Sequence, residues 1–309
     1  MVAAAYLFDG RKFAPLGWQP RKTLRWAAWR PDSGLAILVG NGGYALLFDG
    51  ERLQPMPTGT RHNLRGVAWS PDGKTALLVG NRGAVLVLQG ESCQELAPAT
   101  SENLRRVAWH PEGDYALIVG NAGTVLRYDG PGSELYPLPG DRAHTLRAVA
   151  FRPDGSYALV GAYASRWAGY PRPHALYRCD GRYLQALLAS DDEDDFVAVD
   201  WSARGDALAV GYASRPDGSG LSKAVLFDGS AWRTWTWQAR GVPLGGAWRP
   251  QGDYALIVGE SGTAARFDEE GGLEELATNT DQNLIGPFWR PDGASALVLK
   301  GPGDKIYTV

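Results

Sequence analysis

Short apolar runs alternate with turn residues along the whole chain. In one unit, Leu104 to Trp109 is mostly apolar, and Tyr115 to Val119 is a continuous apolar run. Thr124 to Tyr128 forms a third run, and Glu134 to Leu138 a weaker and more polar fourth. Short runs rich in β-branched and aromatic residues predict β-strands, and a continuous apolar run is typical of a strand covered on both faces. No segment keeps an apolar period of 3.6 residues, so we expect almost no helix.

Residues that favour turns separate these runs. Pro111 fixes φ and Gly113 accepts a positive φ between the first and second runs. Gly120 to Gly123 separates the second run from the third, and Asp129-Gly130 is a strong hairpin signal before the fourth. The unit therefore predicts four antiparallel strands joined by short turns.

The unit recurs along the chain with a pattern of the type Trp-x-Pro-Asp-Gly at its first turn. Its seven anchors are Trp29, Trp69, Trp109, Phe151, Trp201, Trp248 and Trp289. They are separated by 40, 40, 42, 50, 47 and 41 residues. Periods of this length, with several short strands per unit, indicate propeller blades. We therefore predict an all-β, seven-bladed β-propeller with four antiparallel strands per blade, formed by residues 1–309 as a single domain.

The last unit stops after its third predicted strand, which leaves the closure of the ring to the other end of the chain. Residues 11–17 match a fourth strand, and we expect them to complete the last blade, because an open edge invites aggregation. Ala5 to Phe8 also matches a third strand and competes for that place with Lys305 to Val309. The sequence does not decide whether residues 5–8 or residues 305–309 form the third strand of the last blade.

The strand and turn pattern of the unit resembles that of the WD40 repeat class, over the whole chain. The Gly-His dipeptide of typical WD40 repeats is absent, and the Trp-Asp dipeptide is replaced by Phe48-Asp49, Tyr128-Asp129 and Phe227-Asp228. Val119 to Tyr128 gives a weaker resemblance to bacterial propellers of the photosystem-assembly type. Both resemblances imply a binding scaffold, and neither carries a catalytic motif that maps onto this chain.

Composition narrows the classes of partner. The net charge of −3 lacks the basic excess of a general nucleic-acid binder, so no nucleic acid is expected. Cys93 and Cys179 have no CxxC or CxxH neighbours, which disfavours a disulfide framework or a zinc site. No apolar run approaches the length that spans a bilayer, and the N-terminus lacks a basic leader. We expect a cytoplasmic monomer without a cofactor.

Two units have expanded connections between their second and third strands. Ala162–His174 and Tyr212–Ser222 stand where other units have only Asn-x-Gly, and we expect them on the face that carries the connections between blades. Aromatic and arginine side chains are typical interface anchors. The candidates in these connections are Tyr163, Arg166, Trp167, Tyr170, Arg172, Tyr212 and Arg215.

Charges are also distributed unevenly around the predicted ring. Strand one begins with Leu-Arg in four consecutive units, and the arginines are Arg25, Arg65, Arg105 and Arg147. The next three units have Val197, Leu244 and Ile285 there. Strand one is innermost, so the four arginines should cluster on one side of the central opening, suited to carboxylate or phosphate, or else pair locally.

An acidic connection, Asp191 to Asp195, is expected beside the expanded connections, either as a solvated charge run or as a partner contact through Asp194 and Asp195. Hard oxygen ligands suit a divalent cation, but the spacing lacks the internal glycine of an EF-hand, so we expect no metal. Trp26 breaks the tryptophan pattern and is a candidate ligand contact. Trp232, Trp235 and Trp237 predict either an exposed apolar stripe or an edge covered by a neighbour.

No nucleophile motif, phosphate loop or HExxH zinc motif is present, so we assign no catalytic residue. Our prediction is a non-enzymatic scaffold that binds a protein or peptide on its loop face. A carbohydrate or small anionic ligand at the mouth of the central channel is the first alternative. A hydrolase or lyase with an active site at that mouth is the second, since propellers host such enzymes and fold does not decide function.

Overall fold

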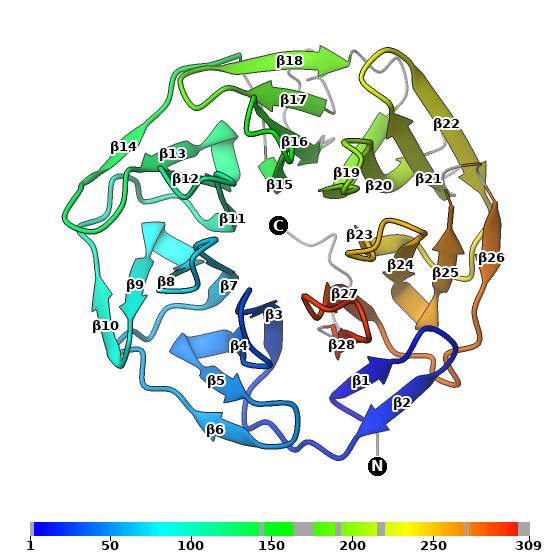
Figure 1. Ribbon diagram of the computed structural model, residues 1–309, viewed down its shortest axis with the longest axis horizontal. Coiled ribbons are helices and arrows are strands. Elements are labelled where there is room, and N and C mark those ends of the chain that lie inside the picture. The colour runs from blue at the N-terminus through cyan, green and yellow to red at the C-terminus, as the bar shows by residue number, and fades with distance from the viewer. Residues whose placement is uncertain are drawn as a thin grey trace.

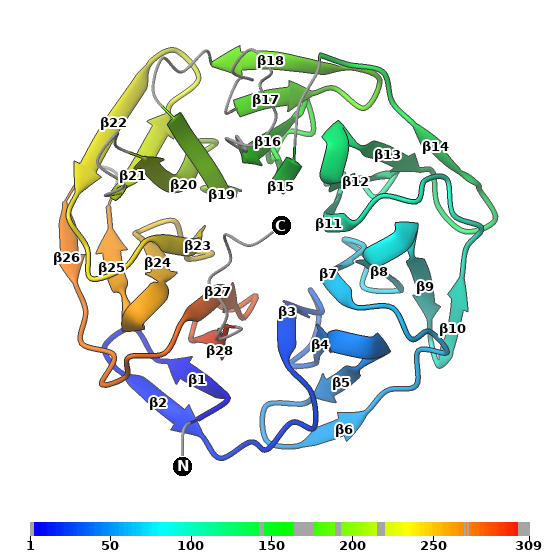
Figure 2. The same cartoon turned by 180° about the vertical axis from the view of Figure 1, so that it is seen from behind.

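Seven four-stranded antiparallel sheets stand in a ring around a central axis, so the chain folds as a seven-bladed β-propeller, as the repeat predicts (Figures 1 and 2). The computed structural model describes residues 3–141, 145–163, 176–188, 193–214, 220–268, 270 and 272–301. The helices in this part of the chain are single 3-10 turns, and none has the length and apolar character needed to cross a membrane.

The first strand of each blade lies nearest the axis and the fourth lies at the rim (Figure 1). From the centre outward, the first three blades are β3 (Leu24–Trp29), β4 (Ala36–Gly40), β5 (Ala45–Phe48), β6 (Leu53–Pro55); β7 (Leu64–Trp69), β8 (Thr75–Gly80), β9 (Val85–Gln89), β10 (Ser92–Glu95); and β11 (Leu104–Trp109), β12 (Ala116–Gly120), β13 (Val125–Tyr128), β14 (Leu135–Pro137). The next three are β15 (Thr145–Phe151), β16 (Ala158–Tyr163), β17 (Leu176–Cys179), β18 (Leu184–Leu188); β19 (Glu193–Trp201), β20 (Ala207–Ser214), β21 (Gly220–Phe227), β22 (Trp232–Trp237); and β23 (Pro243–Trp248), β24 (Ala255–Gly259), β25 (Ala264–Phe267), β26 (Leu273–Glu275). The 3-10 turns between second and third strands are η1 (Asn41–Gly43), η2 (Asn81–Gly83), η3 (Asn121–Gly123) and η4 (Glu260–Gly262).

Both ends of the chain build the seventh blade. Its strands from the centre outward are β27 (Leu284–Trp289), β28 (Ala296–Lys300), β1 (Ala5–Phe8) and β2 (Phe13–Leu16). β1 runs antiparallel to β28, so residues 5–8 occupy the third place that the sequence left open. Phe8 is fully buried, and its ring lies 4.7 Å from that of Phe13. Residues 305–309, the other candidate for this place, lie outside the described residues.

The hydrophobic core lies between neighbouring blades, because each sheet buries both faces against the next. The tryptophans of the repeat belong to it, as predicted, and several also donate a hydrogen bond to the preceding blade. Trp29 Nε1 lies 3.0 Å from the Phe288 carbonyl oxygen, and Trp201 Nε1 lies 3.0 Å from that of Ala150. Trp109 and Trp289 make the same contact at 3.3 and 3.2 Å. The anchor residue of the repeat therefore joins blades through both packing and a hydrogen bond.

The three tryptophans of the outer strand β22 are partly buried rather than exposed. Trp232 stacks on Phe227 at 4.3 Å between ring centroids. Trp235 meets Phe267 of the next blade edge-on at 5.2 Å. Of the two alternatives for this strand, the edge covered by a neighbour is therefore the one observed.

Blade five departs from the predicted boundaries. The loop expected over Tyr212–Ser222 is wrong at both ends, because β20 and β21 stay paired as far as Ser214 and Gly220. This hairpin continues past the level at which other blades turn, and β19 pairs with its extension from Glu193 onward. In blade four, β16 likewise extends through Tyr163 into the predicted loop.

Candidate functional site

One face of the ring carries both the turns between second and third strands and the connections between blades. Gly43 N donates to the His62 carbonyl at 2.7 Å, and Gly83 N donates to that of Glu102 at 2.8 Å. Each of these bonds ties a turn to the connection leading into the next blade. We call this side the turn face.

A β-bulge lies near the start of every innermost strand, just below the turn face. The strand register shifts at Arg25, Arg65, Arg105 and Arg147 in blades one to four. The residue at a bulge is left unpaired in the ladder, and bulges commonly re-aim a side chain beside functional sites. We call these four residues the bulge arginines. They lie on adjacent strands around one side of the central channel, as the sequence predicts.

The bulges of the remaining blades carry no charge. Val197 and Leu244 occupy them in blades five and six. In blade seven Ile285 occupies the equivalent repeat position but is not at a bulge, because it pairs with Leu299 and the register shifts at Gly286-Pro287. Proline has no backbone N–H for the ladder, so the irregularity falls at Pro287 instead.

Asparagines that the sequence reading did not single out orient three of the bulge arginines. Arg105 Nε donates to Asn121 Oδ1 at 2.8 Å, and the same bond joins Arg25 to Asn41 and Arg65 to Asn81. Each asparagine opens the 3-10 turn of the same blade, sixteen residues after its arginine. That spacing is the sequence signal for the pair.

Blade four replaces the asparagine with an aromatic ring at the same spacing. Tyr163 stands sixteen residues after Arg147, and the Arg147 guanidinium lies 5.0 Å from the centroid of its ring. Tyr163 was predicted as a partner contact, and the structure shows it beside a bulge arginine.

A fifth arginine, which the sequence reading missed because it is not repeated, crosses between blades. Arg106 follows Arg105 on β11, and its guanidinium lies 3.5 Å from the ring centroid of Trp26 in blade one. Its Nη1 donates to the carbonyl oxygens of Arg65 and Arg105, each at 2.8 Å. It passes blade two beside Gly66, where a Cβ atom would lie 2.9 Å from the Arg105 carbonyl oxygen. The absence of a side chain there leaves room for the crossing.

Trp26, predicted as a ligand contact, is therefore held within the ring. Besides Arg106 it meets Phe288 of blade seven edge-on, with 4.7 Å between ring centroids. Trp26 and Arg106 thus link blades seven, one, two and three at the centre. We refer to Arg106 and the four bulge arginines together as the arginine cluster.

The arginines of the cluster act on one another electrostatically. Burial, together with the charges of Arg147, Arg65 and Arg25, lowers the pKa of Arg105 to about 9. Burial, with the charges of Arg25 and Arg147, likewise lowers the pKa of Arg65 to about 10. Burial lowers the pKa of Arg106 well below its ordinary value, again with the other arginines contributing. The site disfavours this concentration of positive charge unless an anion balances it.

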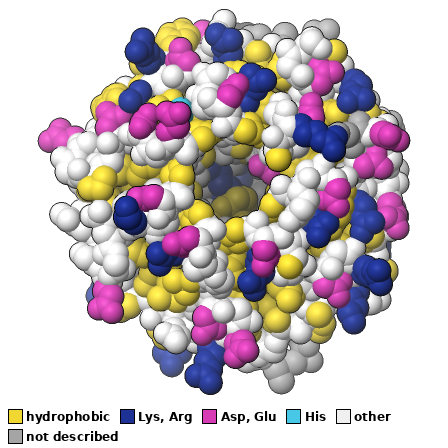
Figure 3. Space-filling view, in the orientation of Figure 1, with side chains coloured by type: hydrophobic (Ala, Val, Ile, Leu, Met, Phe, Trp, Pro, Cys, Tyr) yellow, Lys and Arg dark blue, Asp and Glu magenta, His cyan; other side chains and the backbone are white. Residues whose placement is uncertain are grey.

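No carboxylate in the described residues forms an ion pair with Arg65, Arg105, Arg106 or Arg147. The Nε atoms of Arg106 and Arg147 are enclosed and make no hydrogen bond in this part of the chain. A hollow opens at the centre of the ring, with basic and apolar side chains visible inside it (Figure 3). The arrangement is suited to bind an anion inside the channel mouth.

Asp194 and Asp195, the described aspartates of the acidic segment, do not lie in a solvated connection, which was one of the two alternatives for them. Asp194 and Asp195 lie in β19 and are 2% and 5% exposed, because the extended hairpin of blade five covers them. Asp194 forms an ion pair of 2.5 Å with Lys223, so its charge is balanced locally. Tyr212 is also buried, opposite Asp195. The remaining predicted contacts, Arg166, Trp167, Tyr170, Arg172 and Arg215, lie outside the described residues.

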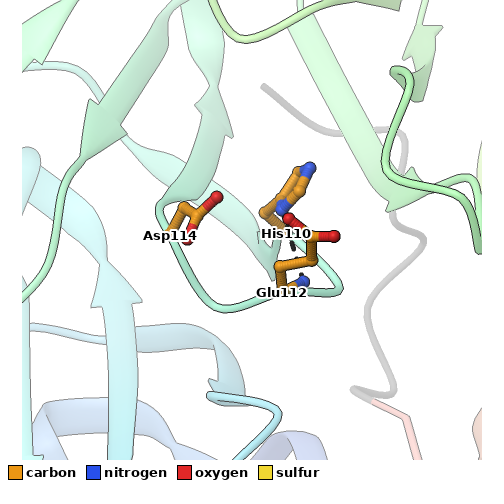
Figure 4. Close-up of side chains that lie close together, drawn as sticks. All are labelled: His110, Glu112 and Asp114. Carbon is orange, nitrogen blue, oxygen red and sulfur yellow. Dashed lines mark hydrogen bonds between the residues drawn. The ribbon is translucent and has the colours of Figure 1, made fainter.

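His110, Glu112 and Asp114 come together on the opposite face, in the turn between β11 and β12 (Figure 4). Glu112 N donates to His110 Nδ1 at 3.3 Å, and His110 Nε2 lies 3.1 Å from the Gly155 carbonyl oxygen. The ring also stacks on Tyr115 at 4.9 Å. Both ring nitrogens are engaged, so His110 joins blades three and four and leaves no nitrogen for a metal ion.

Asp200 on β19 stands where blades one to four and six have alanine at the same repeat position, as at Ala150 and Ala247. Its carboxylate accepts a hydrogen bond of 2.8 Å from Trp248 N in the next blade. Burial raises the pKa of Asp200 to about 6, although this and a second backbone hydrogen bond lower it. Asp200 is therefore an interblade contact with an unusual protonation equilibrium.

Comparison with known proteins gives the chain no family. No protein-family model and no curated protein sequence matches it. The functional inference therefore rests on the residues of the turn face and the channel.

Proposed function

We propose that this protein is a non-enzymatic binding scaffold that receives an acidic protein or peptide partner on its turn face. The observation that carries the proposal is the arginine cluster beside the channel mouth, where Arg65, Arg105 and Arg147 have no carboxylate partner in the described residues. Arginine is suited to this role because its planar guanidinium binds carboxylate and phosphate groups with two parallel hydrogen bonds. The WD40-like pattern of the repeat supports a scaffold role as well.

The alternatives have weaker support. A carbohydrate would need a polar groove rather than a concentration of one charge, whereas a small anion fits the arginine cluster. For an enzyme, His110 and Asp200 are natural acid–base candidates, but each is held in a contact between blades. Their bonding explains both residues without catalysis.

The proposal is tested by capturing partners from an extract of the native host. We compare the parent protein with an Arg65→Glu, Arg105→Glu variant and with an Arg11→Glu, Arg52→Glu control. Arg11 and Arg52 are exposed in turns between third and fourth strands, on the opposite face, so the control makes the same change in net charge. We expect one protein to bind the parent and the control but not the cluster variant. Equal capture by all three would overturn the proposal.

A further inference from the structure

Three of the bulge arginines, Arg65, Arg105 and Arg147, use only part of their donors within the described protein. In Arg65 and Arg105 the asparagine contact uses Nε, and no residue of the described chain contacts the terminal nitrogens by hydrogen bond or ion pair. In Arg147 the Nε atom is enclosed and makes no hydrogen bond there. A charged donor that is removed from water and makes no hydrogen bond costs free energy. Each of these guanidinium groups would therefore be stabilised by a hydrogen-bond acceptor.

The ring does not need arginine at these places. Val197 and Leu244 occupy the equivalent bulges of blades five and six, which close with the same register shift. Four arginines in consecutive blades instead bring like charges together; burial, and after it these charges, lowers the pKa values of Arg65 and Arg105. The repulsion between these charges destabilises the folded protein without a bound anion, and a bound anion relieves it.

The number of charges indicates the kind of anion. A single carboxylate brings one negative charge and two acceptor oxygens, enough for one guanidinium fork. A phosphate-type group brings about two charges and three strong acceptor oxygens, which several guanidinium groups can share. Arg106, one residue further along β11, adds a positive charge that its stack on Trp26 holds in place.

We propose that the arginine cluster is a binding site for a phosphate-type oxyanion carrying at least two negative charges. The site lies inside the channel mouth at the turn face, and Asn81 and Asn121 pre-orient two of the guanidinium groups. The inference rests on the proposed function, since it names the group that the turn face recognises. That group belongs either to a free anion or to a phosphorylated partner.

Isothermal titration of the full-length protein tests the site, with pyrophosphate, inorganic phosphate and citrate as probes. We expect one pyrophosphate per chain, bound at least about tenfold more tightly than citrate. The Arg65→Gln, Arg105→Gln variant should lose at least about tenfold in pyrophosphate affinity, and Arg147→Gln should weaken it separately. The matched Arg11→Gln, Arg52→Gln control should bind as the parent does.

Three results would overturn the inference: no pyrophosphate binding, binding unchanged in both cluster variants, or citrate bound as tightly as pyrophosphate. Thermal melting of each variant without ligand shows whether it remains folded. Treating the extract with phosphatase before capture distinguishes the two sources, because capture is lost only when the partner carries the phosphate. If pyrophosphate does not bind while capture still depends on Arg65 and Arg105, the inference fails and the proposed function stands.

Discussion

At the scale of single residues, Gly66 and Arg106 form one structural unit at the centre of the ring. Arg106 reaches Trp26 across blade two, and a Cβ on Gly66 would lie 2.9 Å from the Arg105 carbonyl oxygen and 3.2 Å from Arg106 Cα. We therefore predict that Gly66→Ala lowers the free energy of unfolding by about 1 to 3 kcal/mol, because the β11 backbone and the Val79 side chain, 3.1 Å from the added Cβ, leave the methyl group no room. Urea denaturation monitored by tryptophan fluorescence measures the change.

Gly17→Ala is the matched control, since it adds the same methyl group where no atom lies within 4 Å. We expect this control to change the free energy of unfolding by no more than about 0.5 kcal/mol. Equal effects at the two glycines would show that the crossing of Arg106 past Gly66 is not constrained as described.

Asp200 gives a prediction about pH. Its pKa is about 6 in the folded protein and about 4 when unfolded, so between these values the folded state binds more protons. Stability should then rise as pH falls from about 7.5 to about 5, by roughly 1.4 kcal/mol from this group. Asp200→Asn keeps an acceptor for Trp248 N and should flatten this dependence, while raising stability at neutral pH. Urea denaturation over this pH range measures it, and identical slopes for parent and variant would contradict the assignment.

The sequence predicts the residues of the site better than their roles. The bulge arginines are readable because they repeat, and consecutive repeats become neighbours in a ring. Arg106 occurs once and is indistinguishable in sequence from any strand residue, so no pattern reveals its stack on Trp26. Ile285 shows that a repeat position does not always have the same local structure. It aligns with the bulge arginines in sequence, but Pro287 moves the bulge of blade seven away from it.

At the scale of strands, closure of the ring depends on β1 and β2. Deleting residues 1–17 removes them, exposes the buried residues of β28 along an open edge, and should give a poorly soluble protein without a cooperative melting transition. Thermal melting followed by circular dichroism measures this.

A circular permutant is the control with identical composition. It begins at Trp18 and carries residues 1–17 after Val309. Lys300 N lies 2.9 Å from the Ala4 carbonyl oxygen, so the joining segment needs to span little distance. We expect the permutant to melt close to the parent. A permutant as unstable as the deletion would show that the order of the chain, rather than the closing strands, determines stability.

The expanded connections give a prediction at the same scale. Trp167 and Arg172 fall outside the described residues, and their chemistry alone makes them anchor candidates. Truncating one interface anchor commonly costs about 2 kcal/mol, so we expect Trp167→Ala with Arg172→Ala to weaken partner binding at least about thirtyfold. Tyr136→Ala, on the exposed outer strand β14, is the control and should bind as the parent does. Surface plasmon resonance with the captured partner measures both, and unchanged affinity would place the partner elsewhere.

Strand boundaries were predictable where a short Asn-x-Gly turn joins the second and third strands, and were missed in blades four and five, where the connection is longer. Blades with Asn-x-Gly turns have strands close to the predicted runs. In blade five, Tyr212 to Ser214 are neither strong turn formers nor a clear apolar run, so pairing with the facing strand decides their structure. The same tertiary pairing draws Asp194 into β19, although its composition favours a solvated connection.

For the whole molecule, the ring converts one repeated position into a local concentration of charge within a protein of net charge −3. The average field therefore does not favour an acidic partner, and attraction has to come from the channel mouth. The period of the repeat predicts the seven blades and places the bulge arginines on neighbouring strands. It does not predict that Arg65, Arg105 and Arg147 lack a carboxylate partner among the described residues, because local pairing depends on side-chain positions that the period does not fix.

Salt dependence follows from this concentration of charge. The Debye length falls from about 30 Å at ~0.01 M salt to about 3 Å at ~1 M, and partly buried charges are screened less than exposed ones. We compare the dissociation constant of the partner from the Arg65→Gln, Arg105→Gln variant with that from the parent. The ratio of the two should therefore be largest at low salt, and it should decrease with added salt without reaching one. The ratio for Arg11→Gln, Arg52→Gln should stay near one throughout, because these charges lie on the opposite face. Titrating the captured partner over this salt range measures both ratios. A cluster ratio that does not change with salt would mean that the arginines hold the partner through shape and packing rather than through charge.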